Sequence, residues 1–224
     1  MLPVINSAAE LIRIVGEIGF IPFFKSSVKG FSVEEITTHL DWWGENRELD
    51  PWEWRKAAAT DGSLAYCKIF GKKAGFVSRA YFPVFAAFRR GNLTFVERYE
   101  NGLSSMAEKR IMALLSDGGS LPSHMLKKQA GFSKDGEKNF EGAITNLQMQ
   151  TYAVIRGFEC KRNSFGHEYG WASAVYSTAE ALFGEQHVDS AHALSAQEAE
   201  HMIFTKVASL FPDASEKQIN KLIR

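Results

Sequence analysis

The sequence has few cysteines, no long hydrophobic run and no excess of either charge. Its 224 residues include only two cysteines, Cys67 and Cys160, which excludes a disulfide framework and predicts buried, reduced thiols. No stretch approaches the ~20 apolar residues of a membrane span, and the first residues lack the charged and apolar regions of a signal peptide. The sequence therefore predicts a cytoplasmic protein without membrane attachment.

Charge of one sign is equally scarce. Lys and Arg together number 26, as do Asp and Glu, so the formal net charge is zero. Residues 103–183 keep the same balance, with nine Lys or Arg against eight Asp or Glu. Phosphate contacts supply most of the non-specific affinity for nucleic acids, so this composition excludes a protein that coats DNA generally. Any DNA binding is expected to be focal and strongly dependent on salt.

The residue patterns of several common chemistries are also missing. The six histidines show no metal-ligand spacing and have no paired cysteines beside them. We find no glycine-rich phosphate loop, nucleophile elbow or dinucleotide fingerprint. The pair Glu34-Glu35 is explained as first-turn charge of a short helix. The sequence therefore predicts neither a bound metal nor a cofactor.

What the sequence does contain is a run of three helical segments in its middle. The first begins with a capping box made by Ser105 and Glu108 and ends at the glycines 118–119. The second is predicted to start at Ser120, with Pro122 in its first turn. Short connections between these helices indicate that they pack against one another.

The third helix is predicted over residues 134–150. Its apolar residues fall on one side of a helical wheel, and its polar residues fall opposite. The apolar side consists of Phe140, Ala143, Ile144 and Leu147. A short helix, a tight turn and a longer helix with a polar outer face are typical of a helix-turn-helix.

A two-stranded ribbon is predicted to follow the third helix. Residues 152–160 and 169–176 are rich in β-branched and aromatic side chains, and a polar loop that contains glycine separates them. Three helices followed by such a ribbon are the outline of a winged helix. An ordinary exposed hairpin made soluble by charge is the alternative interpretation.

Eight polar side chains of this region are predicted to contact double-stranded DNA. Those expected to face the major groove from the third helix are Lys134, Lys138, Asn139, Thr145 and Asn146. Those expected to touch the backbone or the minor groove from the tip of the ribbon are Lys161, Arg162 and Asn163.

The remainder of the chain divides into two further regions. We predict an α+β protein in which a winged helix-turn-helix, residues 103–183, packs with a mixed helix and hairpin region, residues 1–102. In this first region we predict a helix over residues 8–18, a second helix capped by Asp50 and a hairpin whose first strand covers residues 64–70. A helical tail, residues 184–224, follows. The long amphipathic helix predicted in this tail packs on its own domain or forms the seam of a homodimer.

The N-terminal region holds a second candidate site. Trp54 and Arg55, with Lys68 and Lys73 on a predicted hairpin, have the residue types to stack on a base and hold a phosphate. In the alternative interpretation the tryptophan fills the core and Arg55 pairs with a local carboxylate.

Four stretches resemble bacterial proteins of the AlkZ-related family. They are residues 50–55, 65–78, 136–142 and 147–152, and the similarity covers roughly residues 8–184. The family name points to winged-helix DNA glycosylases of the AlkZ and YcaQ type, which excise alkylated or cross-linked bases. The resemblance therefore implies a role in recognising damaged bases.

The resemblance also implies a catalytic pair. The glycosylases carry a Gln-x-Gln or Gln-x-Asp motif that positions the hydrolytic water, and Gln148 and Gln150 match it here. This chain is much shorter than those enzymes, which resemble three tandem winged helices, and its motif lies at the junction of a helix and a strand. For an enzyme, both amides must reach a solvent-accessible cavity, and burial in the core would rule them out.

Two other functions compete with base-damage recognition. A winged helix alone suggests transcriptional control, and the neutral charge suggests a module that binds another protein instead of DNA. A basic surface that joins the third helix to the wing would favour DNA. An apolar groove at that place would favour a protein partner.

Overall fold

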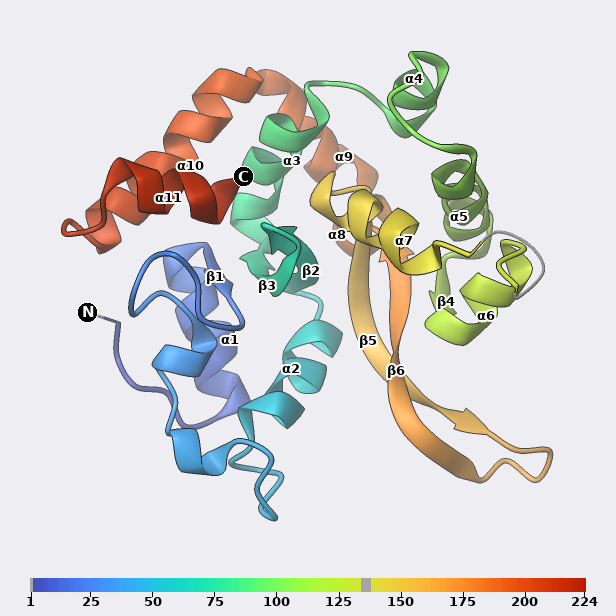
Figure 1. Cartoon of the computed structure of the whole chain (residues 1–224), viewed down its shortest axis with the longest axis horizontal. Coiled ribbons are helices and arrows are strands. Elements are labelled where there is room, and N and C mark those ends of the chain that lie inside the picture. The colour runs from blue at the N-terminus through green and yellow to red at the C-terminus, as the bar shows by residue number, and fades with distance from the viewer. Residues whose placement is uncertain (1, 134–137) are drawn as a thin grey trace.

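A computed structural model describes residues 2–133 and 138–224, and an antiparallel sheet runs through the described part. The six strands lie in the order β1-β3-β2-β5-β6-β4 (Figure 1). They are β1 (Phe20–Pro22), β2 (Leu64–Phe70), β3 (Lys73–Ser78), β4 (Ser120–Pro122), β5 (Ala153–Arg162) and β6 (Glu168–Thr178). Helices pack against the edge strands on both sides of this sheet.

Local signals fix the helices of the N-terminal region. The principal ones are α1 (Ala8–Ile18), α2 (Pro51–Thr60) and α3 (Phe82–Arg90), with short 3-10 turns at 33–35, 39–41 and 79–81. The Asp50 side chain accepts a hydrogen bond from the Trp52 N–H at 2.9 Å and caps α2 as predicted. The predicted strand at residues 64–70 and the helix at residues 8–18 are confirmed.

Phenylalanine rings fill the core of this region. Phe20 from β1 lies 5.0 Å from Phe85 of α3 and 6.1 Å from Phe70 of β2, measured between ring centroids. All three are at most 3% exposed. Phe20 packs edge to face on Phe85 and stacks on Phe70. Each such ring buries a large apolar area, so these contacts position α3 on the sheet.

The winged helix predicted for the middle of the chain is present. Helices α5 (Met106–Gly118), α6 (Ser123–Gln129) and α7 (Phe140–Met149) are followed by the hairpin β5–β6. The capping box of Ser105 and Glu108 opens α5. The fold class is therefore α+β with a winged helix, as the sequence predicts.

One predicted helix start in this domain is wrong, and a second lies outside the described residues. Ser120 does not cap α6, because Ser120–Pro122 forms β4 and pairs with Ser177 and its neighbours in β6. The helix begins after Pro122, whose ring cannot donate within the strand but is tolerated at this edge. Helix α7 begins at Phe140, with Asn139 as its N-cap. Residues 134–137 of the predicted third helix lie outside the described residues.

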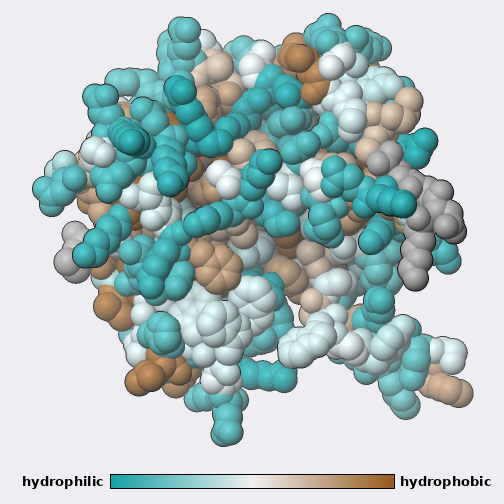
Figure 2. Space-filling view, in the orientation of Figure 1, coloured by the Kyte–Doolittle hydropathy of each residue, from teal (hydrophilic) through white to brown (hydrophobic). Residues whose placement is uncertain are grey.

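The hairpin β5–β6 extends beyond the rest of the molecule (Figure 1). Figure 2 shows a notch between the outer part of this hairpin and the N-terminal region. The register runs from Ala153↔Thr178 at the base to Arg162↔Glu168 near the tip, with two irregularities on the way. The wing is thus a long arm, longer at both strands than the predicted ribbon.

The sheet joins the predicted N-terminal region to the winged helix. Strand β2 pairs with β5 through Tyr66 and Ile155, so hydrogen bonding continues across the predicted boundary at residue 102. The predicted domain limits stay a prediction.

The tail closes over α3. It contains α9 (Glu185–Asp189), α10 (Ala196–Leu210) and α11 (Glu216–Ile223). Helix α8 (Ala179–Phe183) ends the predicted winged-helix region, and α4 (Phe95–Glu100) precedes that region. The apolar stripe of α10 packs on α3, with Ala199, Ile203 and Val207 fully buried. The stripe is therefore covered within the chain, and a homodimer remains a prediction. None of the described helices is long and apolar enough to cross a membrane.

Candidate nucleic-acid interface

Helix α7 stands where a recognition helix stands in a winged helix. The Asn139 side chain accepts a hydrogen bond from the Gly142 N–H at 3.0 Å. A side chain at position 142 would meet the Asn139 amide at about 2.3 Å, so glycine is required beneath this cap. The predicted apolar side, Phe140 to Leu147, is buried as expected.

The outer face of α7 is only partly open. Lys68 of β2 donates from Nζ to the Thr145 hydroxyl at 3.3 Å and lies 3.9 Å from Glu141. At the end of the helix, the Lys72 N–H donates to the Met149 sulfur at 3.3 Å. Contacts from β2 and the β2–β3 turn therefore occupy one flank of the helix, including the predicted DNA contact Thr145.

The other flank of α7 borders a polar groove. Asn139, Asn146 and Gln150 line a cavity of about 590 Å³ together with residues 102–108. Two buried polar atoms in this groove, Ser104 Oγ and Gln150 Oε1, have no hydrogen-bond partner among the described residues. Buried polar atoms normally find a partner, so a water molecule or a ligand would fit here.

Gln148 lies on the opposite side of α7 and has a structural role. It is fully buried, its Oε1 accepts a hydrogen bond from the Lys68 N–H at 3.1 Å, and its Nε2 donates to the Ile144 carbonyl at 3.2 Å. Strand β2 changes register between Cys67 and Phe70, and Gln148 pairs a backbone N–H within that irregular stretch. The structure does not bring Gln148 and Gln150 to one cavity.

Of the lysines predicted on the third helix, one is described. Lys138 is exposed just before α7, whereas Lys134 lies outside the described residues. Asn146 is also exposed. Lys138 and Asn146 are therefore the DNA contacts predicted for this helix that remain accessible.

The three predicted wing residues differ in whether their side chains are held by neighbouring groups. Asn163 accepts hydrogen bonds at its Oδ1 from the Phe165 and His167 N–H groups, both at 3.0 Å, so it shapes the turn. Arg162 pairs with Glu168 across the hairpin at 2.7 Å, and both side chains are largely exposed. Lys161 is exposed and forms no ion pair with the described residues.

Sequence reasoning missed the aromatic side chains of the wing. Trp171 is 95% exposed, Phe165 is 83% exposed and Tyr169 is 53% exposed. The signal was present, because Phe165 interrupts an otherwise polar loop. Tyr169 and Trp171 lie within the second strand of the predicted ribbon, where aromatic residues indicate a strand and not a binding surface. Three exposed aromatic rings beside Lys161 and Arg162 give the wing a mixed apolar and basic character.

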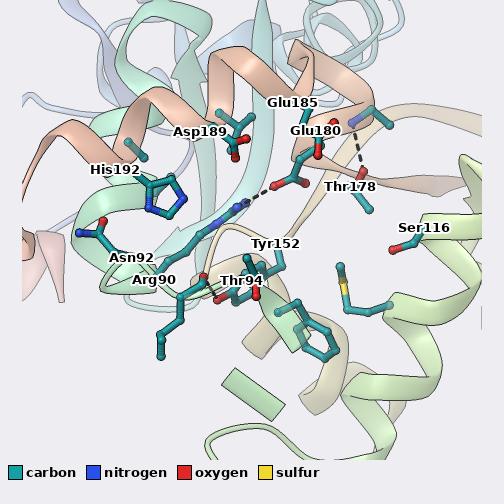
Figure 3. Close-up of a pocket in the computed structure, with 17 residues that line it drawn as sticks. Arg90, Asn92, Thr94, Ser116, Tyr152, Thr178, Glu180, Glu185, Asp189 and His192 are labelled. Carbon is teal, nitrogen blue, oxygen red and sulfur yellow. Dashed lines mark hydrogen bonds and ion pairs between the residues drawn. The ribbon is translucent and has the colours of Figure 1, made fainter. Parts of the chain in front are cut away.

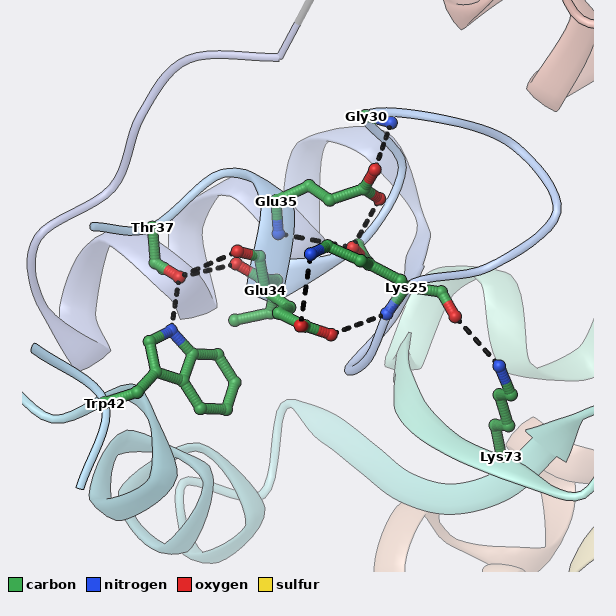
Figure 4. Close-up of polar contacts among 9 residues, drawn as sticks. Lys25, Gly30, Glu34, Glu35, Thr37, Trp42 and Lys73 are labelled. Atoms are coloured by element: carbon green, nitrogen blue, oxygen red, sulfur yellow. Dashed lines mark hydrogen bonds and ion pairs between the residues drawn. The ribbon is translucent and has the colours of Figure 1, made fainter. Parts of the chain in front are cut away.

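The predicted pocket of Trp54, Arg55, Lys68 and Lys73 is not assembled as one site. Trp54 is buried and its indole N–H donates to the Glu48 carbonyl at 2.6 Å. Lys73 donates from Nζ to the Lys25 carbonyl at 2.9 Å and so fastens a loop (Figure 4). Lys68 faces α7, as described above.

Arg55 is buried, and its guanidinium lies against aromatic rings. The Cζ atom is 3.6 Å from the centroid of the Trp52 ring and 4.3 Å from that of Phe158 on β5. Burial lowers the pKa of Arg55, and the nearby Tyr66, Glu53 and Asp50 oppose this shift. The ion pairs of the described residues do not include Arg55, so the predicted pairing with a local carboxylate is absent there.

A second cavity of about 480 Å³ lies between α3, α8 and the start of β5 (Figure 3). Arg90 extends across it. The guanidinium donates to Glu180 at 2.6 Å and to the Thr151 hydroxyl and carbonyl at 3.0 and 2.7 Å. The same group lies 4.5 Å from the Tyr152 ring. Because its donors are paired, Arg90 ties the N-terminal region to the base of the wing.

Within residues 2–133 and 138–224, no group of three or more His, Cys, Asp or Glu side chains is placed to hold a metal ion. The two cysteines are free. Cys67 is buried and Cys160 is half-buried. Burial raises the pKa of the Cys67 thiol to about 12.

The chain belongs to the AlkZ-related family, whose model matches residues 5–224. No curated protein matches the sequence. Among solved structures, the DNA glycosylase AlkZ of Streptomyces sahachiroi is similar over 97% of this chain and 59% of its own, with 14% identity and a TM-score of 0.46. A MarR-family transcriptional regulator from Silicibacter pomeroyi is similar over 63% of this chain and 76% of its own, with 18% identity and a TM-score of 0.25. The chain therefore spans less than two thirds of the AlkZ protein.

Proposed function

We propose that this protein binds double-stranded DNA with its wing and the open strip of α7. The observation that carries the proposal is the projecting hairpin, which presents Lys161 and Arg162 beside three exposed aromatic rings. Cationic side chains at such a tip suit phosphate contacts. Membership of the AlkZ-related family, with its resemblance to DNA glycosylases, supports DNA as the partner.

The exposed rings of the wing favour contact with the grooves of a duplex. Large aromatic side chains that stay exposed to water are unusual on a protein without a partner, because removing their apolar surface from water lowers the free energy. Apolar wedges inserted from the minor groove unstack base steps and kink DNA. Trp171 and Phe165, at 95% and 83% exposure, are the side chains best suited to this role.

The coverage of α7 favours recognition of DNA shape or damage over reading of an operator. Reading base edges requires several free side chains in the major groove. Thr145 is engaged by Lys68, and Asn139 caps the helix. Lys138 and Asn146 remain, which is a small set for sequence readout. We therefore favour a protein that recognises alkylated or distorted DNA over a transcriptional regulator.

The first test is fluorescence anisotropy with a short duplex, undamaged and alkylated, over a salt series. The double variant Lys161→Ala/Arg162→Ala should lower affinity at low salt and reduce the salt dependence by about one to two phosphate contacts. We expect a smaller effect from Arg162, because Glu168 already pairs with it at 2.7 Å.

The matched control is Lys206→Ala/Lys217→Ala. Lys217 is exposed and Lys206 lies on α10, in the tail that Figure 1 places away from the hairpin. This variant removes the same charge and should bind DNA as the wild type does. Equal losses in both double variants would point to general electrostatics instead of the wing. Failure of the wild type to bind either duplex at low salt would reject DNA and favour a protein partner.

Base excision is a second candidate function, and one observation favours it. Gln150 Oε1 is a buried acceptor without a partner among the described residues, in a groove that opens beside α7. An amide there has the geometry to orient water. Incubation with an alkylated duplex should release the modified base, and Gln150→Ala should abolish the release. Gln148→Leu should keep it in the folded fraction. Binding of the alkylated duplex without release of the modified base would indicate a protein that recognises the damage but does not excise the base.

A further inference from the structure

Arg55 is an unusual cation because it is buried and forms no ion pair with the residues that the structure describes. The residue is 6% exposed, and its Nε is a buried donor that lacks an acceptor among the residues described. Burying one charge without an opposite charge is strongly unfavourable, and each unpaired buried polar atom in a native protein calls for an explanation.

The carboxylates nearest in sequence are already used. Asp50 caps α2 by accepting the Trp52 N–H, and Glu53 pairs with Lys56 at 2.6 Å. Arg55 instead has the faces of Trp52 and Phe158 for neighbours. Stacked rings stabilise a guanidinium through its faces and leave its edge free to donate in the plane. Such an edge suits the paired oxygens of a phosphate group.

An aromatic surface continues outward from this arginine. The ring of Trp52 lies 6.4 Å from that of Trp43, and Trp43 lies 5.4 Å from Trp42. Trp42 is held by a hydrogen bond from its indole N–H to the Thr37 hydroxyl at 2.9 Å (Figure 4). Trp43 is 66% exposed, so one indole of this layer is presented to solvent.

The backbone of Trp43 is strained. Its φ of 56° lies in the left-handed region that bulky side chains rarely occupy. Strain of this kind is unfavourable and concentrates at sites of function. An exposed indole held in a strained conformation, linked through the Trp52 ring to a cation that forms no ion pair with the described residues, is a combination that packing alone does not explain.

The site also adjoins the wing. Phe158, which covers one face of Arg55, belongs to β5, the strand that carries Lys161 and Arg162. Helix α2 lies beside the hairpin in Figure 1, and Figure 2 shows the notch between the N-terminal region and the outer hairpin. A DNA strand held by the wing would therefore pass near Arg55 and Trp43.

We infer that Arg55, Trp52 and Trp43 form a platform for an unpaired nucleotide of DNA. Arg55 donates to the phosphate of that nucleotide, and Trp43 stacks on its base. Stacking of this kind tolerates every base, so the platform selects an unpaired nucleotide and not a sequence. The inference rests on the proposed function, because it places the platform beside a duplex that the wing holds.

The test compares a blunt duplex with the same duplex carrying a five-nucleotide single-stranded overhang, by fluorescence anisotropy. The wild type should bind the overhang duplex about tenfold more tightly, the scale of one stacked base. Trp43→Ala and Arg55→Met should each remove that advantage while affinity for the blunt duplex is unchanged. Lys161→Ala/Arg162→Ala should lower affinity for both duplexes and preserve their ratio.

The substitutions are chosen so that a loss of folding is not mistaken for a loss of binding. Methionine keeps the volume of Arg55 and removes the unpaired charge, so the thermal midpoint of Arg55→Met should hold or rise. Arg55→Lys keeps the charge but loses the planar guanidinium that can donate two parallel hydrogen bonds. We therefore expect it to recover only part of the preference for the overhang duplex. Arg13→Met, on exposed helix α1, is the matched control and should bind as the wild type does.

Two outcomes separate this inference from the proposed function. Equal affinity of the wild type for blunt and overhang duplexes would reject the platform while leaving the wing intact. Binding of the overhang duplex and of the isolated single strand, without any binding of the blunt duplex, would support the platform and reject the wing. A preference that survives in both Trp43→Ala and Arg55→Met would also overturn the inference.

Discussion

Two arginines of this protein illustrate how environment sets the role of one side chain. Arg90 is bonded to Glu180 and Thr151 and stacks on Tyr152, so its charge is matched where it is buried. Arg55 is buried as well, but its guanidinium lies against the rings of Trp52 and Phe158 and forms no ion pair with the described residues. A buried charge that is matched stabilises the connection between elements, whereas one that is not suits a ligand. At the residue scale, a buried arginine whose hydrogen bonds are satisfied holds structural elements together, whereas a buried arginine with an unsatisfied donor is suited to binding a ligand.

The cysteines give a direct check on burial. Cys67 is fully buried and its pKa is raised to about 12, whereas Cys160 is half-buried on the wing strand β5. Because the thiolate is the reactive form, a thiol reagent at pH 8 should label one cysteine in the native protein and two after denaturation. Cys160→Ser should abolish the native reaction. Rapid labelling of both thiols in native protein would contradict the buried position of Cys67.

Helix α7 shows how one element can be both a recognition helix and part of the core. Gln148 joins it to β2 by accepting the Lys68 N–H, its amide also donates to the Ile144 carbonyl within the helix, and the Lys68 side chain covers its flank. The helix is therefore fixed to the N-terminal region, so under the proposed function the DNA would have to adapt to it. This rigidity suits the recognition of distorted DNA better than adjustment to different sequences.

Loss of Gln148 should weaken this attachment. Gln148→Leu keeps the size of the side chain but leaves the Lys68 N–H without its acceptor, so we expect stability to fall by about 1–3 kcal/mol. Urea denaturation should show a lower midpoint with an unchanged slope. Gln150→Leu is the matched control, since Gln150 Oε1 has no partner in the described chain. A loss of base release without any loss of stability in Gln148→Leu would instead revive the catalytic interpretation.

At the scale of the whole molecule, the predicted regions are connected in several ways. The sheet continues through Tyr66 and Ile155, Arg90 joins α3 to the wing, and α10 covers α3. Elements from all three predicted regions thus share one core. The hairpin β5–β6 is the exception, since its outer half extends away from the body (Figure 1).

This connectivity predicts one unfolding transition. Tryptophan fluorescence, dominated by the four indoles of the N-terminal region, and far-ultraviolet circular dichroism should report the same midpoint in urea. Arg90→Ala should lower both midpoints together, because it breaks contacts between regions. Two separated transitions would show instead that residues 1–102 and 103–183 unfold independently.

Local signals were sufficient for most elements. Capping residues and periodicity predicted the helix at 8–18, the start of α2 at Asp50 and the capping box of α5. They failed at Ser120, where pairing with β6 overrides the helix-start signal of a serine followed by proline. Strand pairing depends on a partner far along the chain, so no local pattern could reveal it.

The sequence alone determined the composition of the wing, the order of helices and hairpin, and the resemblance to the AlkZ-related family. Only the tertiary structure decided which side chains remain free. Gln148 became part of the core and Gln150 part of a groove, although both stand in one short motif. Successive turns of a helix face different neighbours, and the helical wheel cannot say which neighbour will cover each side. For the same reason Arg55 forms no ion pair with a carboxylate of the described chain, while Trp171 stands in solvent.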